Sequence, residues 1–327
     1  MSKDIPTALI VGGQISPAAV AVAQARGVAL TSCDPYPTPE QLIATANACG
    51  AKALIIRMGR VTAQALDAIP SLKIIAKHGV GVDGIDLGAA AKRDVPVVIA
   101  GGANAQSVAE QALALLLSVA RSTAYLDRRL RAGAWDKSTY AGTELTGKSI
   151  GLIGLGVIGR AFLTLLAPFG MTVRVYDPYL SADRLPHGAQ MVESIDTLLE
   201  ASDIVSLHCP LTPDNCGLID AAALGRMKDN AILINTARGE LIDEPALVEA
   251  LRTGVIAGAG LDTFASEPTG ADHPLWTLDN VVGSPHVGAN THEARVRVGI
   301  SCVEQIADYL DSGRIDPRNH VNAMANA

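Results

Sequence analysis

Short apolar runs alternate along the chain with stretches in which apolar residues recur at every third or fourth position. Over roughly the first 100 residues each run ends close to a glycine or a charged residue, as buried strands do before a turn. The strand-like runs are TALIVGG (7–13), AKALIIR (51–57), LKIIAKHG (72–79) and VPVVIAG (95–101), and the helical stretches are PAAVAVAQARG (17–27) and PEQLIATANACG (39–50). This repeated order predicts an open, mostly parallel α/β sheet.

The alternation then stops and begins again, which indicates a second unit. Residues 104–135 form a long helical stretch without a strand signal, and they lead into KSIGLIG (148–154). The later strand-like runs are MTVRVYD (171–177), DIVSLHCP (203–210), AILINTAR (231–238), VIAGAGLD (255–262) and NVVGSPH (280–286), and a last helix is expected from about Thr291 to Ser312. The pattern predicts two α/β units, the second starting near Gly147.

Composition narrows the class of protein without changing this picture. The 327 residues leave room for about two domains of roughly 150 residues. The net charge is −7 and no Lys/Arg run is present, so a nucleic-acid partner is not expected. No apolar run approaches the length of a membrane span, and the N-terminus is interpreted as a strand rather than a signal peptide. The five scattered cysteines predict free thiols and a cytoplasmic protein.

A glycine-rich segment, GLIGLGVIGR (151–160), carries the first sign of chemistry. Gly154 permits a tight turn, Gly156 lets a pyrophosphate approach the backbone, and Gly159 lets helix and strand pack closely. The pyrophosphate would rest on free N–H groups at the start of the next helix. The motif alone is a weak signal in a chain with 31 glycines, but here a strand precedes it and a helix follows.

An acid follows this loop at the expected distance. The next strand ends in Asp177, about 20 residues further on, where a carboxylate can accept hydrogen bonds from a ribose and repel a 2′-phosphate. Asp177 could instead merely end a strand, since Asp-Pro is a common start of a turn. The order strand, loop, helix, strand and acid favours a dinucleotide site that prefers NAD to NADP.

Polar residues stand where three later strands end, at the edge where ligands bind in open α/β sheets. Arg238 and Asp262 end two strands, Glu267 comes five residues after Asp262, and His286 ends the last strand. Arginine offers a fork for a carboxylate, and histidine can donate a proton to a carbonyl when a nearby acid favours its protonated form. Beside a nicotinamide, these groups predict interconversion of 2-keto and 2-hydroxy acids.

Other histidines have plainer interpretations. By their spacing, His78 and His208 are as consistent with structural roles as with functional ones. His292 does not form an H-E-x-x-H pair, because Val296 stands four residues later, so it is expected to begin the last helix. We predict no metal site.

At this point the residues match a known family. The segments GLIGLGVIGR, HCPLTPDNCGLID (208–220), INTARGELIDEPALVEAL (234–251), AGLDTFASEP (259–268) and SPHVGANTHEA (284–294) closely resemble the D-isomer-specific 2-hydroxyacid dehydrogenases, in particular the phosphoglycerate dehydrogenase-like branch. KHGVGVDGIDLGAAAKRDVPV (77–97) and NAQSVAEQALALLL (104–117) resemble the substrate-domain motifs of that family. The resemblance runs from about residue 50 to about residue 300, and the first fifty residues match only in pattern.

The resemblance implies why the glycine loop lies in mid-chain. In this family a flavodoxin-like substrate domain is built from both chain ends and an NAD-binding Rossmann domain is inserted between them. It implies here a substrate domain of residues 1–102 and 296–327 and an inserted NAD domain of residues 103–295. The fold class expected is therefore α/β, with two doubly wound parallel sheets. The family also implies a homodimer whose arm lies near residues 131–147, with Trp135 as a candidate anchor.

The family's roles can be transferred to matching positions. His286 would be the acid/base, Glu267 its partner and Arg238 the arginine that binds substrate. The residues implied for the cofactor NAD are Gly154, Gly156, Val157, Ile158, Asp177, His208, Pro210, Thr236, Ala237, Asp262, His286 and Gly288. The backbone N–H groups of Val80 and Gly81 would hold the substrate carboxylate.

The substrate itself is less well defined. Formate dehydrogenases of the family carry Gln at the position of Glu267, so formate is not expected. Relatives with "VDN" have Asn where Gly84 stands here, and phosphoglycerate dehydrogenases tend to have Ser where Met58 stands, which puts the phosphorylated substrate in doubt. Arg57 ends a strand. A substrate that carries only a methyl group at this place, as pyruvate does, would leave the charge of Arg57 unpaired. We therefore predict hydroxypyruvate or a C3-anionic analogue, phosphohydroxypyruvate or sulfopyruvate, rather than pyruvate.

Two other interpretations stay open from the sequence. Some family members are NAD-sensing corepressors that bind peptides and do not turn over a metabolite. A Rossmann protein with a different reductase chemistry is the third possibility. The complete set of Arg238, Glu267 and His286 favours the dehydrogenase.

Overall fold

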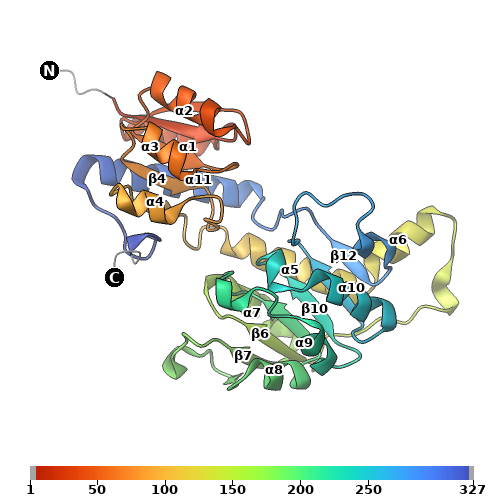
Figure 1. Ribbon diagram of the computed structural model, residues 1–327. Helices are drawn as coiled ribbons and strands as arrows, with labels where there is room; N and C mark the ends of the chain where they lie inside the picture. The colour runs from red at the N-terminus through yellow and green to blue at the C-terminus, as the bar shows by residue number, and fades with distance from the viewer. Residues whose placement is uncertain (1–4, 324–327) are drawn as a thin grey trace. The chain divides into compact units, whose positions relative to one another are not determined.

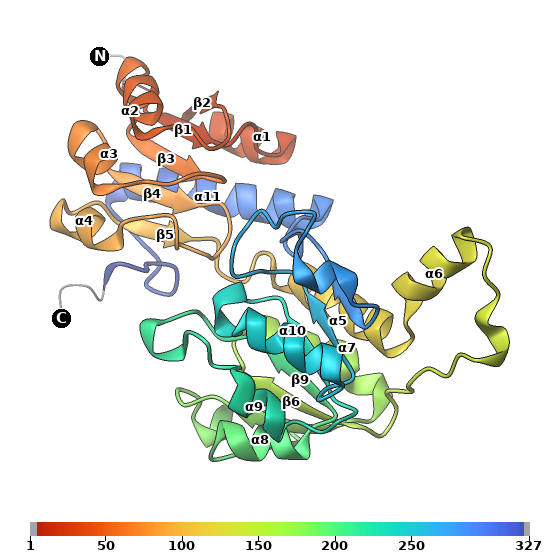
Figure 2. The same ribbon diagram turned by 45° about the vertical axis from the view of Figure 1, so that its right-hand side comes forward.

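The computed structural model describes residues 5–323, shown as a ribbon in Figures 1 and 2. The chain forms two compact units, one from Met1–Asn104 with Ala289–Ala327 and the other from Ala105–Gly288. Residues 103–104 and 289–295, which the sequence analysis places in the inserted domain, fall in the first unit. Residues 289–295 do so because they lead into and begin helix α11 (His292–Ser312), which packs on helix α1 and strand β4 of that unit.

The first unit contains a parallel sheet of five strands in the order β2-β1-β3-β4-β5, the flavodoxin-like order. The strands are β1 (Thr7–Val11), β2 (Ala29–Cys33), β3 (Ala53–Ile56), β4 (Ile74–Lys77) and β5 (Val97–Ile99). The helices are α1 (Pro17–Ala25), α2 (Pro39–Ala48), α3 (Ala63–Ala68), α4 (Leu87–Lys92) and α11. Successive strand residues point to opposite faces, so one core lies under α1 and α11 and a second under α2, α3 and α4.

The second unit contains a parallel sheet of seven strands in the order β12-β11-β10-β9-β6-β7-β8, which extends the Rossmann order. Its strands are β6 (Ser149–Ile153), β7 (Thr172–Tyr176), β8 (Ala189–Met191), β9 (Ile204–Leu207), β10 (Ile232–Asn235), β11 (Gly258–Leu261) and β12 (Val281–Gly283). Its helices are α5 (Ala105–Ala120), α6 (Thr123–Arg131), α7 (Val157–Leu166), α8 (Ile195–Ala201), α9 (Ala221–Arg226) and α10 (Glu244–Thr253). Both sheet faces are covered, as the predicted fold class requires.

Short 3₁₀ turns occupy several loops of the second unit. They are Asp136–Ser138, Ala167–Phe169, Ala182–Arg184, Pro213–Asn215, Gly239–Leu241 and Pro274–Thr277.

The helical stretch predicted over 104–135 is wrong as a single helix. It breaks at Ser122, whose φ of 48° is left-handed, so that α5 ends and α6 leaves in a new direction. α5 buries an apolar face in the core beside α7, whereas α6 has no buried residue. The last helix was predicted correctly: Thr291 caps α11 through Ala294 N at 3.1 Å, and Gly313 ends it with a φ of 71°.

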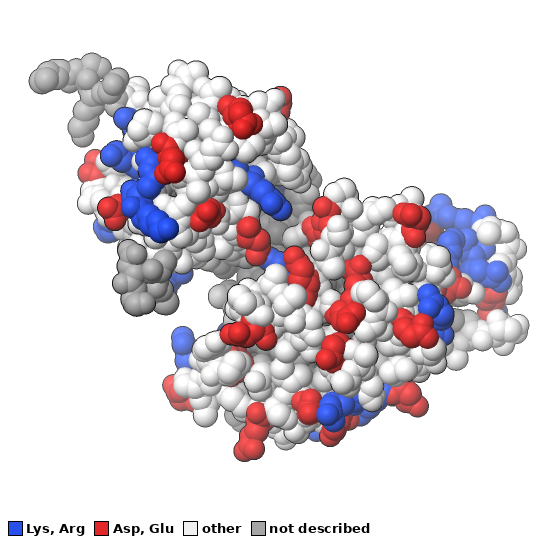
Figure 3. Space-filling view, in the orientation of Figure 1, with Lys and Arg blue, Asp and Glu red and all other residues white. Residues whose placement is uncertain are grey.

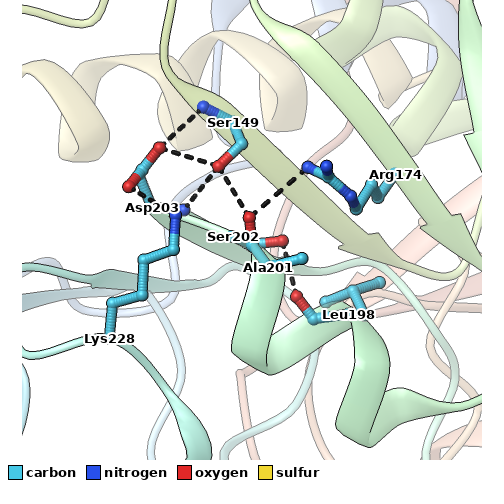
Figure 4. A network of polar contacts seen from close by, with 7 residues as sticks. All are labelled: Ser149, Arg174, Leu198, Ala201, Ser202, Asp203 and Lys228. Atoms are coloured by element: carbon cyan, nitrogen blue, oxygen red, sulfur yellow. Dashed lines mark hydrogen bonds and ion pairs between the residues drawn. The ribbon is translucent and has the colours of Figure 1, made fainter.

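A charged network joins the amino ends of the central strands in the second unit (Figure 4). Asp203, just before β9, accepts hydrogen bonds from Ser149 N at 2.8 Å and Ser149 Oγ at 2.7 Å at the start of β6. Lys228 Nζ lies 2.9 Å from the other carboxylate oxygen. This network lies at the sheet edge opposite the carboxyl ends, so it fixes strand positions and leaves the other edge for chemistry.

On the face shown in Figure 3, acidic side chains are spread over both units, whereas basic side chains gather in a few places. Within residues 5–323 no helix is long and apolar enough to cross a membrane. The five cysteines are all free, as predicted.

Candidate active site

The glycine loop connects β6 to α7 and has the geometry of an anion cradle. Gly154 has a φ of 92°, and a Cβ there would lie 2.8 Å from the backbone of His208 and Cys209. A Cβ at Gly156 would meet nothing within 4 Å, so the space before the helix is open. Gly156 is the N-cap of α7 and provides no side-chain cap, which leaves first-turn N–H groups for an anion.

These glycines therefore fit a dinucleotide pyrophosphate. The predicted neighbours Val157 and Ile158 are the first two residues of α7, and Val157 is exposed. Gly159 lies one turn on, where a Cβ would approach Gly154 O to 3.0 Å. A side chain at Gly159 would push the helix away from the loop.

Asp177 follows β7 and is tied to the glycine loop. Its Oδ2 accepts from Leu155 N at 2.9 Å, and its Oδ1 accepts from Tyr179 N at 3.0 Å. Each carboxylate oxygen keeps a further lone pair that can accept from a ribose hydroxyl. The position and the charge fit the predicted role.

His208, which follows β9, lies against the glycine loop. Its Nε2 lies 2.9 Å from Ser206 Oγ, and its ring packs against Phe162 with centroids 5.3 Å apart. Burial lowers the pKa of His208 to about 4, so the ring is neutral at pH 7. Pro210, two residues further on, is exposed, and its carbonyl accepts from Asn215 Nδ2 at 2.8 Å.

The loop after β10 carries Thr236, Ala237 and Arg238, and a buried residue fixes its path. Asn235 Oδ1 accepts from Ala237 N at 2.9 Å, while its Nδ2 donates to Arg238 O at 2.7 Å. Arg238 Nη1 donates to Ala237 O at 2.7 Å. Next in the chain, a Cβ on Gly239 would overlap the backbone of Phe264, so this loop lies directly on the loop after β11.

Asp262, after β11, holds the loop that carries His286. Its Oδ1 accepts from Ser284 Oγ at 2.5 Å and Val287 N at 3.0 Å, and its Oδ2 accepts from Gly288 N at 2.7 Å. The side chain is only 2 % exposed. At most one further donor fits this carboxylate, so Asp262 positions the 284–288 loop whatever else it binds.

His286 and Glu267 form a hydrogen-bonded pair. His286 Nδ1 lies 2.8 Å from Glu267 Oε2, and Glu267 Oε1 accepts from Phe264 N at 3.0 Å. Because the carboxylate engages Nδ1, the proton that the ring can exchange is the one on Nε2. Both side chains are partly exposed, as a group that meets a substrate must be.

Two residues that the sequence analysis missed anchor the Glu267 loop. Glu244, the first residue of α10, accepts from Ala265 N at 3.1 Å, and its other oxygen lies 2.7 Å from His273 Nε2. Both side chains of the pair are mostly buried. They are 29 residues apart in sequence, so no local pattern could have linked them.

The candidate substrate residues of the first unit follow β3 and β4. Arg57 Nη1 donates to Gly12 O at 2.6 Å and Gln14 O at 2.7 Å, so its guanidinium is fixed against the loop after β1. Among the described residues, no backbone carbonyl accepts from the N–H groups of Val80 and Gly81, which suits them for an anion. No cluster of metal-ligating side chains occurs within the part of the chain that the structure describes.

Residues 113–288 match the model of the D-isomer specific 2-hydroxyacid dehydrogenase, NAD binding domain. The chain is 46% identical over 257 residues to D-3-phosphoglycerate dehydrogenase of Mycobacterium leprae, covering 78% of this chain and 48% of that protein. It is 43% identical over 260 residues to hydroxypyruvate reductase of Thermotoga maritima, covering 79% and 84%. The chain thus spans about half the length of the phosphoglycerate dehydrogenases that it matches.

Solved structures agree with these relatives. The TT0316 protein of Thermus thermophilus superposes with a TM-score of 0.87 at 36% identity, covering 96% of this chain and 99% of that one. A glyoxylate reductase from Paecilomyes thermophila gives a TM-score of 0.87 at 27% identity, covering 97% and 98%. The site and these matches place the chain in the D-isomer-specific 2-hydroxyacid dehydrogenase family, and the second unit contains that family's NAD-binding domain.

Proposed function

We propose that the chain is an NAD-dependent dehydrogenase that interconverts a small 2-keto acid and its D-2-hydroxy acid. The observation that carries this proposal is the hydrogen bond of 2.8 Å between His286 Nδ1 and Glu267, which leaves Nε2 for proton exchange. The bound nicotinamide would supply or accept the hydride. The residues of the chain handle the substrate's charge and its proton.

Each residue then has a defined task. Arg238 pairs with the substrate carboxylate and orients the carbonyl. In the reducing direction His286 donates its Nε2 proton to the carbonyl oxygen as the C2 carbon receives a hydride, and the product is the hydroxy acid. Glu267 stabilises the imidazolium before transfer, and in the oxidising direction Nε2 takes the hydroxyl proton back. Arg57, Val80 and Gly81 are proposed to bind substrate, on the strength of the family resemblance.

The substrate is proposed to be hydroxypyruvate or a C3-anionic analogue rather than pyruvate. The named relatives include D-3-phosphoglycerate dehydrogenases and a hydroxypyruvate reductase. The alternative, an NAD(H)-sensing corepressor, is not favoured, because a binding protein has no need of an acid/base pair with an open nitrogen. A homodimer is proposed from the exposed Trp135, and free cysteines support a cytoplasmic location.

The test is NADH oxidation, followed by absorbance, with pyruvate, hydroxypyruvate, phosphohydroxypyruvate and sulfopyruvate. We expect turnover that His286→Ala lowers by roughly 10²- to 10⁴-fold, the range for a lost general acid. NADH affinity, measured by fluorescence, should change far less than turnover. Turnover that His286→Ala leaves intact would refute the assignment.

A further inference from the structure

The first unit contains a pocket of ≈ 350 Å³ whose walls come from four separate segments. Ser16 and Pro17 contribute the start of α1, Arg57 follows β3, His78 follows β4, and Arg295 lies in the first turn of α11. No Asp or Glu lines it. The sequence analysis singled out Arg57 alone, because Arg295 is far away in the chain.

The two arginines form an unneutralised cationic pair. Burial and the nearby charge of Arg295 lower the pKa of Arg57, which shows that the two guanidinium groups repel. Within residues 5–323, neither Arg57 nor Arg295 has a carboxylate within ion-pair distance. Two like charges in one pocket without a counter-charge cost free energy that a bound anion would recover.

Arg57 is held in place for such a role. Its Nη1 is occupied by Gly12 O and Gln14 O, at 2.6 and 2.7 Å. The remaining N–H groups of the fork are left for another acceptor. Arg295 lies at the exposed side of the pocket and has no recorded side-chain hydrogen bond among the described residues.

His78 adds a ring nitrogen that lacks a partner. Its Nε2 is buried and has no hydrogen-bond partner in the described chain. Burial, and then the charge of Arg57, lower the pKa of His78 to about 4, so the ring is neutral and can offer one N–H. A Cβ on Gly299 would lie 3.7 Å from Nε2 and 2.9 Å from Ala19 Cβ. Gly299 therefore lets α11 approach α1 closely at this pocket.

We propose that this pocket binds a tetrahedral oxyanion group, a phosphate or a sulfonate, with Arg295 as the residue that sets the preference for it. Two guanidinium groups, one imidazole and the positive end of α1 offer more donors than a single carboxylate can accept. The group has two possible sources. It is either the C3 substituent of the substrate, which rests on the proposed function, or a free inorganic anion.

The first experiment measures binding without the cofactor or a substrate. Calorimetric titration of the purified chain with inorganic phosphate or sulfate, at constant ionic strength set by chloride, should show saturable binding. Arg295→Gln should weaken it about 10- to 100-fold, the loss of one charge-assisted contact. Arg295→Lys, which keeps the charge, should weaken it less, and circular dichroism checks that both variants fold.

Arg297→Gln is the matched control on the same helix. Arg297 Nε donates to Ala103 O at 2.8 Å, and the residue does not line the pocket. Phosphate binding by this variant should equal that of the wild type. The proposal falls if the wild type binds neither anion, or if both glutamine variants weaken binding alike.

The second experiment separates the two sources of the anion. If the C3 group occupies the pocket, Arg295→Gln should lower kcat/KM for phosphohydroxypyruvate and sulfopyruvate about 10- to 100-fold more than kcat/KM for hydroxypyruvate. If a free anion occupies it, all three values should fall together or not at all while phosphate binding is lost. Arg295-dependent phosphate binding without keto-acid turnover would uphold the pocket and sink the proposed function. Keto-acid turnover without Arg295-dependent phosphate binding would uphold the proposed function and sink the pocket.

Discussion

His286 lies in a left-handed backbone conformation, with a φ of 51°, that a non-glycine residue adopts at a cost of about 1 kcal/mol or more. Its own N–H donates to Asp262 O at 2.8 Å and Ser284 O at 2.9 Å, and Asp262 also binds the two residues that follow. These bonds over-determine the loop. The strain turns the imidazole toward Glu267, so it has a mechanistic use at this position.

Exchange of Glu267 for Gln tests the pairing at the residue scale. Gln keeps the shape and an oxygen toward His286 Nδ1 but removes the charge that stabilises the imidazolium. Keto-acid reduction needs the protonated ring, so the pH above which activity declines should move to lower values. The measurement is kcat/KM against pH for both proteins. A superimposable profile would show that Glu267 does not control the proton.

Asp177 is expected to set the choice of cofactor. Its charge should repel the 2′-phosphate of NADPH, so the wild type should prefer NADH. Asp177→Asn keeps an acceptor for Leu155 N and removes the charge, while Asp177→Ala removes both. Both variants should lower the ratio of kcat/KM with NADH to kcat/KM with NADPH by roughly 10-fold or more. A wild type that uses NADPH better would contradict this assignment.

The sequence could identify site residues that end strands, and it could not identify those that hold them. Arg238, Asp262 and His286 each follow an apolar run, which marks them directly. Glu244 and His273 face each other only because the loop after β11 folds back over the start of α10. Arg295 reaches the pocket of Arg57 only through the packing of α11 on the first sheet.

At the scale of elements, the start of α10 has a positioning role that can be tested. Glu244→Ala removes the acceptor for Ala265 N and should lower kcat by roughly 10-fold, because Glu267 loses its anchored loop. Glu244→Gln keeps that acceptor and should restore most of the activity. Glu249→Ala is the control on the same helix, since Glu249 pairs with Arg252 at 2.7 Å on the surface. Equal activity of the Ala and Gln variants, or a loss with Glu249→Ala, would argue against positioning.

The Asp203 network should make the second unit sensitive to acid. Burial opposes the charge, but the hydrogen bonds from Ser149 and Lys228 prevail and lower the pKa of Asp203 to about 2 from 3.8. A carboxylate with a lowered pKa stabilises the fold above about pH 4, and this contribution is lost as the pH falls from about 4 to 2. Asp203→Asn should therefore lower the free energy of unfolding by about 1 to 2 kcal/mol at pH 7 and by about half as much near pH 3, the middle of this range.

Urea unfolding at the two pH values measures this difference. Asp229→Asn is the matched control, because Asp229 is exposed and near Lys228 in sequence. It should have no effect at either pH. A destabilisation by Asp203→Asn that is equal at pH 7 and pH 3 would mean that the charge is irrelevant.

Elements were predictable where both sheet faces are covered. The central strands are continuous apolar runs, whereas the edge strand β2 (ALTSC) is half polar and the sequence analysis did not name it. An edge strand has one neighbouring strand and is less fully buried, so its sequence is less uniformly apolar and harder to identify as a strand. The break at Ser122 was invisible for a similar reason, since helical residues continue on both sides of it.

At the scale of the whole molecule, the inserted order of the chain has a simple consequence. The first sheet is completed by helix α11 from the chain's other end, and Asn322 also binds Val97 N at 2.8 Å and Val95 O at 2.9 Å. The core of the first unit therefore needs residues that come after the whole second unit in the chain. This explains why the glycine loop lies in mid-chain.

The homodimer is the last prediction, and helix α6 is its basis. Figures 1 and 2 show α6 and the segment after it extending away from the sheet of the second unit. The helix has no buried residue, and Leu130 and Trp135 are 57% and 77% exposed. Basic side chains gather at this end of the unit in Figure 3, where α6 carries Arg128, Arg129 and Arg131. An aromatic anchor with arginines around it is the composition of an interface.

Light scattering should give twice the chain mass of 33.8 kDa. Trp135→Ala should weaken self-association by roughly 30-fold or more, the loss of one interface hot spot, and shift the mass toward the monomer on dilution. Tyr36→Ala, which removes another exposed aromatic from the first unit, should leave the mass unchanged. A wild-type monomer, or a dimer indifferent to Trp135, would show that α6 and its segment are not the interface.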